Sequence, residues 1–282
     1  MKKIGFIDYY ISEWHANNYP VWIDDVCKEL GYNYKVCYGW AEMDKSLTDG
    51  RSTEEWCKAY NVEKCQTIEE LCFKSDCLII LSPSVPEKHL IYAKEAFKCG
   101  KRTYVDKTFA PSGKEAEEIF ALGKKYGTTF FSTSALRYAT EIYGGDKDVS
   151  IVVTGGGRAL EEYVIHQLEM IAVRMGMAIK RVMTQKTGDK AYDVYLEYED
   201  GRRATMKYSP DNPFTMERTT ERGDIIKSEI NSDYFKILIR KILIFFESGE
   251  IDFNVNDTVK IMAVREKVIE SLSKMGKWID VQ

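Results

Sequence analysis

The chain has 282 residues, 44% of them hydrophobic, which suits one large domain or two of medium size. It carries 40 Lys and Arg against 44 Asp and Glu, a net charge of −4 that gives no electrostatic footprint for nucleic acid or an anionic membrane. No apolar run is long enough to cross a bilayer, and the seven cysteines include no Cys-x-x-Cys pair, so we expect no zinc site and a reduced, cytoplasmic protein.

Strands and helices alternate over the first half of the chain. The run Cys77–Leu81 is apolar throughout, as is typical of a strand buried on both faces. This alternation predicts an α/β, Rossmann-type, doubly wound parallel sheet over residues 1–136. The expected strands are 2–7, 34–38, 77–81, 103–105 and 128–133, and the expected helices are 17–30, 53–60, 67–73, 87–99 and 114–126.

The second half, residues 137–282, has a different pattern. A strand is expected at 150–153 and a helix at 159–175, followed by a hairpin that turns at Asp200-Gly201. The alternation in the hairpin leaves one face polar, so we expect a second α/β domain with an open-faced, mainly antiparallel sheet. A final helix is expected from apolar residues spaced by three and four: Ile261, Val264, Val268, Leu272 and Met275.

Asp106 and Lys107 follow the expected strand 103–105 directly. The carboxyl ends of strands are where open α/β sheets bind their ligands, so these side chains are candidates for a site. The alternative interpretation is an ordinary solvated strand end.

The first strand is followed by a turn that would hold a pyrophosphate in a dinucleotide fold, where glycines let the backbone approach the ligand. Asp8, Tyr10 and Glu13 occupy the expected glycine positions. Two like charges about 4 Å apart cost roughly 1 kcal/mol in water and about 4 kcal/mol at an effective dielectric near 20, so the usual cofactor pose is disfavoured. The second strand, expected to end near Tyr38, also lacks the acidic residue that binds ribose.

This turn is rich in aromatic residues, which either stack on the ring of a base or sugar or fill space left by an absent ligand. They are Tyr9, Tyr10, Trp14, His15, Tyr19 and Trp22.

The expected helix 159–175 places Glu162, His166 and Glu169 on one stripe, apart from its apolar face. One interpretation is a histidine held by a carboxylate and ready for proton transfer. The alternative is a solvated helix face.

Four short segments together resemble the Gfo/Idh/MocA oxidoreductases, the family of glucose–fructose oxidoreductase and inositol dehydrogenase. Asp106-Lys107-Thr108 resembles the family's Glu-Lys-Pro, and Glu162 with His166, after Gly155-Gly-Gly, resembles its Asp-x-x-x-His helix. The other two segments are Ser82-Pro83-Ser84 with His89 downstream, and Ser134 to Tyr138.

The resemblance implies hydride transfer between NAD or NADP and a hydroxyl of a sugar or polyol. It implies that Lys107 polarises the hydroxyl and His166, beside Glu162, takes its proton, both acting on one substrate. It also implies a homo-oligomer formed through the second sheet and a small-molecule substrate. We expect no metal site. The cofactor-binding candidates are Asp8, Tyr9, Tyr10, Ser82, Pro83, Asp106 and Lys107, and the substrate-binding candidates are Trp14, His15, Arg137 and Tyr138.

Two alternatives come from the residues themselves. Asp8, Tyr10 and Glu13 favour a non-enzymatic binding or sensor protein that has kept the fold and lost dinucleotide binding. The second alternative is an enzyme with the same site and non-redox chemistry, such as proton abstraction next to a carbonyl.

Overall fold

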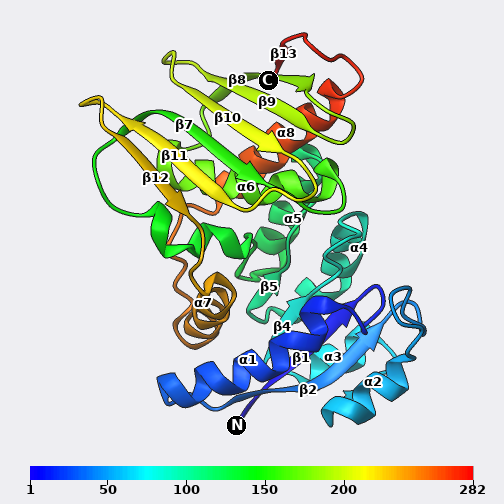
Figure 1. Ribbon diagram of the computed structural model, residues 1–282. Helices are drawn as coiled ribbons and strands as arrows, with labels where there is room; N and C mark the ends of the chain where they lie inside the picture. Colours follow the sequence, from blue (N-terminus) through cyan, green and yellow to red (C-terminus); the bar gives the residue numbers. More distant parts are fainter. Residues whose placement is uncertain (282) are drawn as a thin grey trace. The chain divides into compact units, whose positions relative to one another are not determined.

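The computed structural model describes residues 1–281, which divide into two compact units (Figure 1). The first unit contains Met1–Pro111, Glu115–Thr133 and Lys236–Val255, and the second contains Ser112–Lys114, Ser134–Phe235 and the chain from Asn256 onward. The chain passes from the first unit to the second after Thr133, and the segment Lys236–Val255 returns to the first unit. None of the helices in residues 1–281 has the length and apolarity of a membrane span.

The first unit is built on a six-stranded sheet in which every pair is parallel, in the order β3-β2-β1-β4-β5-β6. This confirms the expected doubly wound sheet, with β1 at its centre and the chain progressing outward on both sides. The strands are β1 (Lys2–Asp8), β2 (Tyr34–Ala41), β3 (Glu63–Lys64), β4 (Cys77–Ile80), β5 (Thr103–Val105) and β6 (Phe130–Phe131).

Capping side chains and a glycine with positive φ explain where helices of this unit begin and end. Ser52 and Glu55 form a capping box at the start of α2, and Gly31, with a φ of 68°, ends α1. The helices are α1 (Trp14–Leu30), α2 (Thr53–Tyr60), α3 (Ile68–Lys74), α4 (Glu87–Ala96), η1 (Phe97–Cys99), α5 (Gly113–Tyr126) and α7 (Tyr234–Ser248).

Two features of these helices differ from the sequence-based expectations. Helix α1 begins at Trp14 rather than Asn17, because the Glu13 side chain caps its first turn. Helix α7 was not predicted; its apolar face packs in the first unit, where Phe245 meets Phe131 edge-on with ring centroids 5.0 Å apart.

The second unit contains a seven-stranded sheet in the order β12-β11-β7-β10-β9-β8-β13. Only β7 and β10 pair in parallel, so the expected mainly antiparallel sheet is confirmed. The strands are β7 (Asp148–Gly155), β8 (Ile179–Lys186), β9 (Tyr192–Tyr198), β10 (Arg203–Tyr208), β11 (Thr215–Thr220), β12 (Ile225–Glu229) and β13 (Ile279–Asp280), and the helices are η2 (Ala135–Tyr138), η3 (Thr140–Ile142), α6 (Leu160–Met175) and α8 (Asn256–Ser271).

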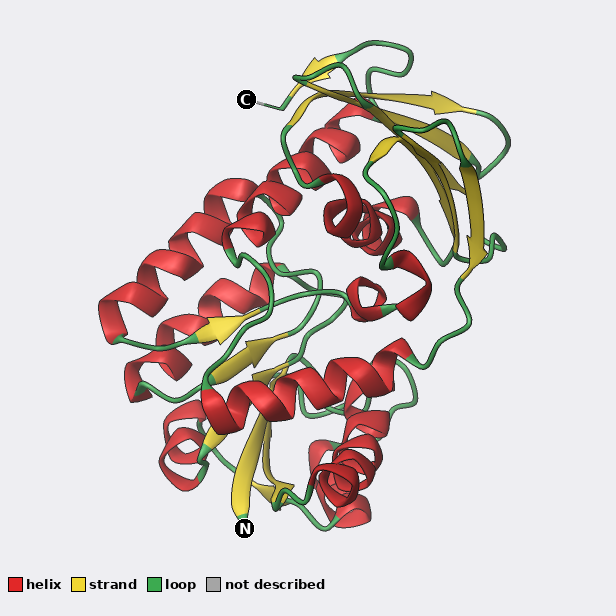
Figure 2. Cartoon of the chain, turned by 90° about the vertical axis from the view of Figure 1, so that its left-hand side faces the viewer, coloured by secondary structure: helices red, strands yellow, loops and turns green. Residues whose placement is uncertain are grey.

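Helices α6 and α8 cover one face of this sheet (Figures 1 and 2). Along β9, Val194, Leu196 and Tyr198 are buried, whereas the residues between them are partly exposed, as the alternation predicted. Helix α8 ends at Ser271, four residues before Met275, because the chain turns there through hydrogen bonds from Ser273 and Lys274 back to the last helical turn.

Candidate functional site

Three loops meet at the carboxyl edge of the first sheet. Asp8 is the last residue of β1, Ser82 follows β4 and Asp106 follows β5. One oxygen of Asp8, Oδ1, accepts hydrogen bonds from the backbone N–H of Tyr9 (2.7 Å) and of Ser82 (3.0 Å). The β1 and β4 loops are therefore tied together at the edge where open α/β sheets bind ligands.

Asp106 is paired with His15 from the first turn of α1. The histidine Nδ1 is hydrogen-bonded to the Asp106 carboxylate, whose other oxygen accepts from the Tyr104 hydroxyl at 3.1 Å. Asp106 is 1% exposed and His15 is 6% exposed. Burial acts to raise the pKa of Asp106, but the charge and hydrogen bond of His15, helped by Lys107, outweigh it and hold that pKa below its usual value. Asp106 is therefore a buried carboxylate, and the interpretation as a solvated strand end is wrong for this residue.

Lys107 is only partly buried, and its ammonium lies 3.5 Å from the carbonyl oxygen of Pro83. The peptide bond from Lys107 to Thr108 is cis. A fully buried histidine, His89, holds the following loop, because its ring nitrogens bond to the carbonyls of Phe109 and Leu81. Burial lowers the pKa of His89, whereas the hydrogen bonds to the two carbonyls, which together require both ring N–H groups, act to raise it. His89 is a buried structural link in the loop that follows Lys107.

The amino-terminal turn of α1 is occupied by a side chain of the protein itself. Glu13 accepts from the backbone N–H groups of His15, at 2.8 Å, and of Ala16. These are the groups that bind a pyrophosphate when a helix N-terminus forms an anion site. Burial raises the pKa of Glu13, whereas the charge of His15 acts to lower it.

The space beside this turn is too small for a diphosphate. A cavity of about 20 Å³ lies between the turn and the loop after β4, lined by Asp8, Tyr9, Tyr10, Glu13, Ser82, Pro83, Ser84 and Val85. That volume holds about one water molecule. The residues present therefore do not fit a pyrophosphate placed on α1, in agreement with the sequence-based expectation.

Asp8 contributes to this obstruction by its bulk more than by its charge. Its second oxygen, Oδ2, has no hydrogen-bond partner among the described residues. Burial and the neighbouring Glu13 raise the pKa of Asp8 well above its usual value, which favours the neutral carboxylic acid. The charge repulsion expected from Asp8 is correspondingly smaller than the sequence suggested.

An acidic residue does follow β2, contrary to expectation. The strand continues to Ala41, which pairs with Asp8, so Glu42 lies at the position from which acidic residues bind ribose. Its carboxylate accepts from Lys88 Nζ at 2.5 Å and from the Tyr92 hydroxyl at 2.9 Å. The strand was predicted too short because Gly39 interrupts its apolar pattern.

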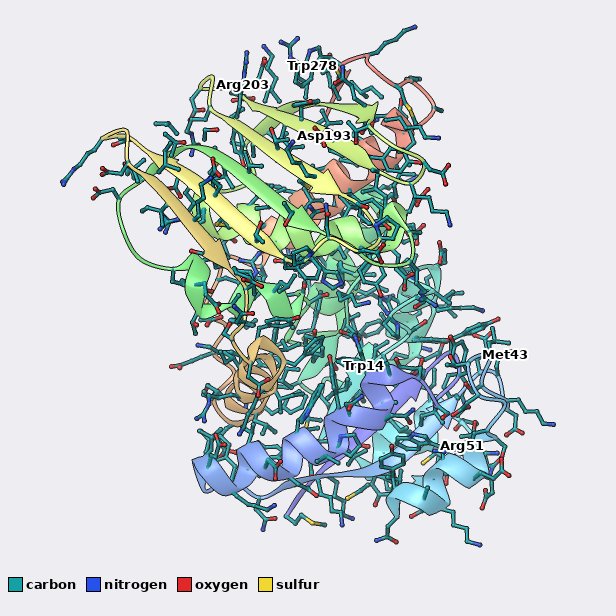
Figure 3. The ribbon with its side chains drawn as sticks, viewed as in Figure 1. Trp14, Met43, Arg51, Asp193, Arg203 and Trp278 are labelled. Carbon is teal, nitrogen blue, oxygen red and sulfur yellow. The ribbon has the colours of Figure 1, made fainter. Side chains whose placement is uncertain are left out.

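The aromatic residues of the first turn are in mutual contact. His15 stacks on Tyr19 with ring centroids 5.3 Å apart, and Trp14 meets the rings of both His15 and Trp22 edge-on, at 5.2 and 5.5 Å. Trp14 nevertheless remains 51% exposed, and it is labelled at the start of α1 in Figure 3.

In the second unit, His166 on α6 is bonded through Nδ1 to the Ser134 hydroxyl at 2.6 Å. Ser134 donates its backbone N–H to Glu169, which also forms an ion pair with Arg137. His166 is 9% exposed and Glu169 is 2% exposed, so the interpretation of this stripe as a solvated helix face is wrong.

The contacts of three further candidates in this unit are described, and their roles in catalysis and substrate binding stay predictions. Glu162 forms an ion pair with Arg158 on the helix surface, and Ser134 forms a hydrogen bond with His166. Arg137 and Tyr138, proposed to bind substrate, are each 4% exposed. Arg137 therefore serves to hold Glu169 and the start of η2 against α6.

No established protein-family profile matches the chain. A segment of 62 residues is 34% identical to the uncharacterized oxidoreductase YhhX of Escherichia coli K12, covering 22% of this chain and 18% of YhhX. Structural similarity extends much further. The apo scyllo-inositol dehydrogenase of Lactobacillus casei superposes over 100% of this chain and 98% of its own, with a TM-score of 0.77 at 12% identity. GenD2 of gentamicin A biosynthesis, solved in complex with NAD, superposes over 99% and 97% with a TM-score of 0.77, also at 12% identity.

The fold is therefore that of the Gfo/Idh/MocA dehydrogenases, as the sequence resemblance implied. At these identities the superpositions establish the fold, and the short YhhX match covers too little of either protein to transfer an activity.

Proposed function

We propose that this protein is an oxidoreductase that acts on a hydroxyl or carbonyl group of a small polyhydroxylated molecule, such as a sugar or polyol. The observation that carries the proposal is Lys107, a partly exposed ammonium at the carboxyl end of β5 beside the buried Asp106–His15 pair. The dehydrogenase fold over the whole chain supports the reaction class, and the scyllo-inositol enzyme among its structural relatives supports the substrate class.

Lys107 and His166 have the chemistry that such a reaction needs. A cation beside a hydroxyl oxygen lowers the pKa of that hydroxyl and eases loss of its proton. When Nδ1 of His166 donates to Ser134, Nε2 is the ring's acceptor and can take that proton. We assign Lys107 to polarise the reacting oxygen and His166 to accept the proton.

NAD or NADP is the cofactor class that the resemblance and the NAD complex of GenD2 suggest. Glu13 and the small cavity beside it do not fit a pyrophosphate on α1. For that reason no step of the proposal is assigned to the dinucleotide, and we expect its affinity to be reduced.

The filled turn favours a second candidate function. A protein that binds a small molecule without turnover, or that transfers protons without redox chemistry, needs no pyrophosphate site. Glu13 as an internal cap is the specific observation that supports this candidate.

Assembly and location belong to the same proposal. The face of the second sheet opposite α6 and α8 carries partly exposed side chains, among them Asp193, Arg203 and Trp278 (Figure 3). We propose that two copies associate through this face in the cytoplasm. Light scattering at micromolar concentration tests the association, and a monomer would contradict it.

Titration of the purified protein with NADH and with NADPH, followed by tryptophan fluorescence, tests the proposed function. Saturable quenching followed by turnover of a sugar or polyol supports the oxidoreductase. Binding of polyols with neither dinucleotide binding nor turnover supports the second candidate.

A further inference from the structure

We propose that Cys72 and Cys99 form a modification site at which hydrogen peroxide converts the two thiols reversibly into a disulfide. Cys99 reacts with the peroxide first, and Cys72 then closes the disulfide. The site precedes β5, at the opposite end of that strand from Asp106 and Lys107, and the inference does not depend on the proposed function.

The two thiols meet although they belong to different helices. Cys72 lies on α3 and Cys99 is the last residue of η1, and their side chains are hydrogen-bonded to each other. Both sulfur atoms also face the carbonyl oxygen of Ala96, at 4.0 Å from Cys72 Sγ and 2.8 Å from Cys99 Sγ. Sulfur atoms in hydrogen-bond contact need only a small side-chain movement to form an S–S bond.

Lys101 ties together the two segments that carry these thiols. Its ammonium donates to the backbone carbonyl oxygens of Cys72 and Ser75 at the carboxyl end of α3. Its backbone N–H donates to the sulfur of Cys99. The chain that follows η1 is therefore attached to the end of α3, which keeps the two sulfur atoms within reach of each other.

Cys99 is the thiol that a peroxide from solvent meets first, because it is partly exposed whereas Cys72 is 4% exposed. The hydrogen bond from Cys72, together with the N–H and charge of Lys101, lowers the pKa of Cys99 to about 6, although burial opposes this. The thiolate gives up the hydrogen bond to Ala96 and accepts those from Cys72 and Lys101. The same hydrogen bond and burial raise the pKa of Cys72, so Cys99 is the nucleophile.

The oxidation has two steps, with hydrogen peroxide as the oxidant. The Cys99 sulfur attacks one peroxide oxygen, so that an S–O bond forms, the O–O bond breaks, and the leaving hydroxide takes up a proton to become water. The Cys72 sulfur then attacks the sulfenic acid of Cys99. The S–S bond forms, the S–O bond breaks, and the hydroxyl group leaves as water with the proton of Cys72. The two sulfur atoms lose the two electrons that reduce the peroxide.

The test treats the reduced full-length protein with an equimolar amount of hydrogen peroxide, blocks the remaining thiols with N-ethylmaleimide, and maps the unreduced digest by mass spectrometry. The expected product is a pair of peptides joined through Cys72 and Cys99, which dithiothreitol separates. Cys72→Ser should leave Cys99 as a sulfenic acid that dimedone traps, with unchanged far-ultraviolet circular dichroism. The map of the wild-type product does not depend on the folding of any variant.

Cys37→Ser is the matched control, since Cys37 is also partly exposed but burial raises its pKa. This variant should form the disulfide at the wild-type rate, whereas Cys99→Ser should slow peroxide consumption by about tenfold or more. Peroxide consumption by Cys99→Ser at the wild-type rate overturns the inference. A wild-type product in which Cys99 is joined to a cysteine other than Cys72, or accumulates as a sulfenic or sulfinic acid, also overturns it.

Discussion

The imidazole of His15 is hydrogen-bonded to the carboxylate of Asp106, although the two residues are 91 positions apart in the chain. The contact joins the first turn of α1 to the loop that carries Lys107. Burial acts to raise the pKa of Asp106, but the electrostatic interaction and hydrogen bond with His15, together with the nearby Lys107, hold it below its usual value. The pair makes this edge of the sheet a buried polar site.

His166→Asn should reduce turnover by about 10²- to 10⁴-fold, the range typical of general-base removal. Glu162→Gln should have little effect, since Glu162 is paired with Arg158 at the surface. Steady-state kinetics of both variants measures the difference. Equal losses in the two variants would show that Glu162, and not Ser134, orients the histidine.

Replacing Glu13 with serine should increase the affinity for NADH by about tenfold or more. Serine still caps the helix but removes the charge and bulk of the carboxylate, and one repulsive charge is worth roughly 1 to 4 kcal/mol at this distance. Unfolding free energy should change by less than about 1 kcal/mol. Calorimetric titration with NADH measures the affinity, with Ser52→Ala at the cap of α2 as the control for capping alone. Unchanged NADH affinity in Glu13→Ser would show that another feature limits binding.

The raised pKa values of Asp8 and Glu13 predict how stability depends on pH. The folded state holds these protons more tightly than the unfolded state, so the stability they contribute is full below about pH 4 and is lost as pH rises through the folded-state values. Asp8→Asn, which is neutral at every pH, should flatten this fall. Urea denaturation between pH 4 and 8 measures this pH dependence, and Asp24→Asn, at an exposed position of α1, is the control. A slope that Asp8→Asn leaves unchanged would contradict the assignment of Asp8 as a neutral acid.

Cys99 should be the more reactive of the two partly exposed cysteines. A hydrogen bond from Cys72, together with the nearby Lys101 charge, lowers the pKa of Cys99 to about 6, whereas burial raises the pKa of Cys37. Only the thiolate is alkylated at an appreciable rate, so at pH 7 iodoacetamide should modify Cys99 first. Mass spectrometry of samples taken at successive times measures the rate of modification of each cysteine. A Cys99 rate that still rises tenfold between pH 7 and 8 would contradict it.

The parallel sheet of the first unit was predictable from the chain because β1, β2, β4 and β5 each have a short apolar run and are followed by a helix-forming pattern. Strand β3 (Glu63–Lys64) has no apolar run and was not predicted. Asp106 and Lys107 were predictable as site candidates for the same reason, because ligands bind at the carboxyl ends of the strands in such a sheet. The pairing of Asp106 with His15 was not predictable, because it depends on two segments that meet only in the folded chain.

Other features were missed for local reasons. The position of Glu42 after β2 was not predicted because Gly39 interrupts the apolar pattern of that strand. The start of α1 was not predicted because Trp14 and His15 do not favour a helix on their own. Burial of His166 and Glu169 could not be deduced from the helix pattern alone. Their partners Ser134 and Arg137 lie in a separate segment whose short 3₁₀ turn has no periodic signal.

The most direct test of the proposed function is turnover of a panel of sugars and polyols with NAD⁺ and NADP⁺, monitored as reduced nicotinamide for the wild-type protein and for Lys107→Met. We predict that the wild-type protein reduces NAD⁺ or NADP⁺ in the presence of at least one polyol. We also predict a loss of about 10²-fold or more in Lys107→Met, with unchanged far-ultraviolet circular dichroism and with the exposed Lys58→Met fully active. Absence of reduction by the wild type across the panel, or equal rates in wild type and Lys107→Met, would contradict the proposal.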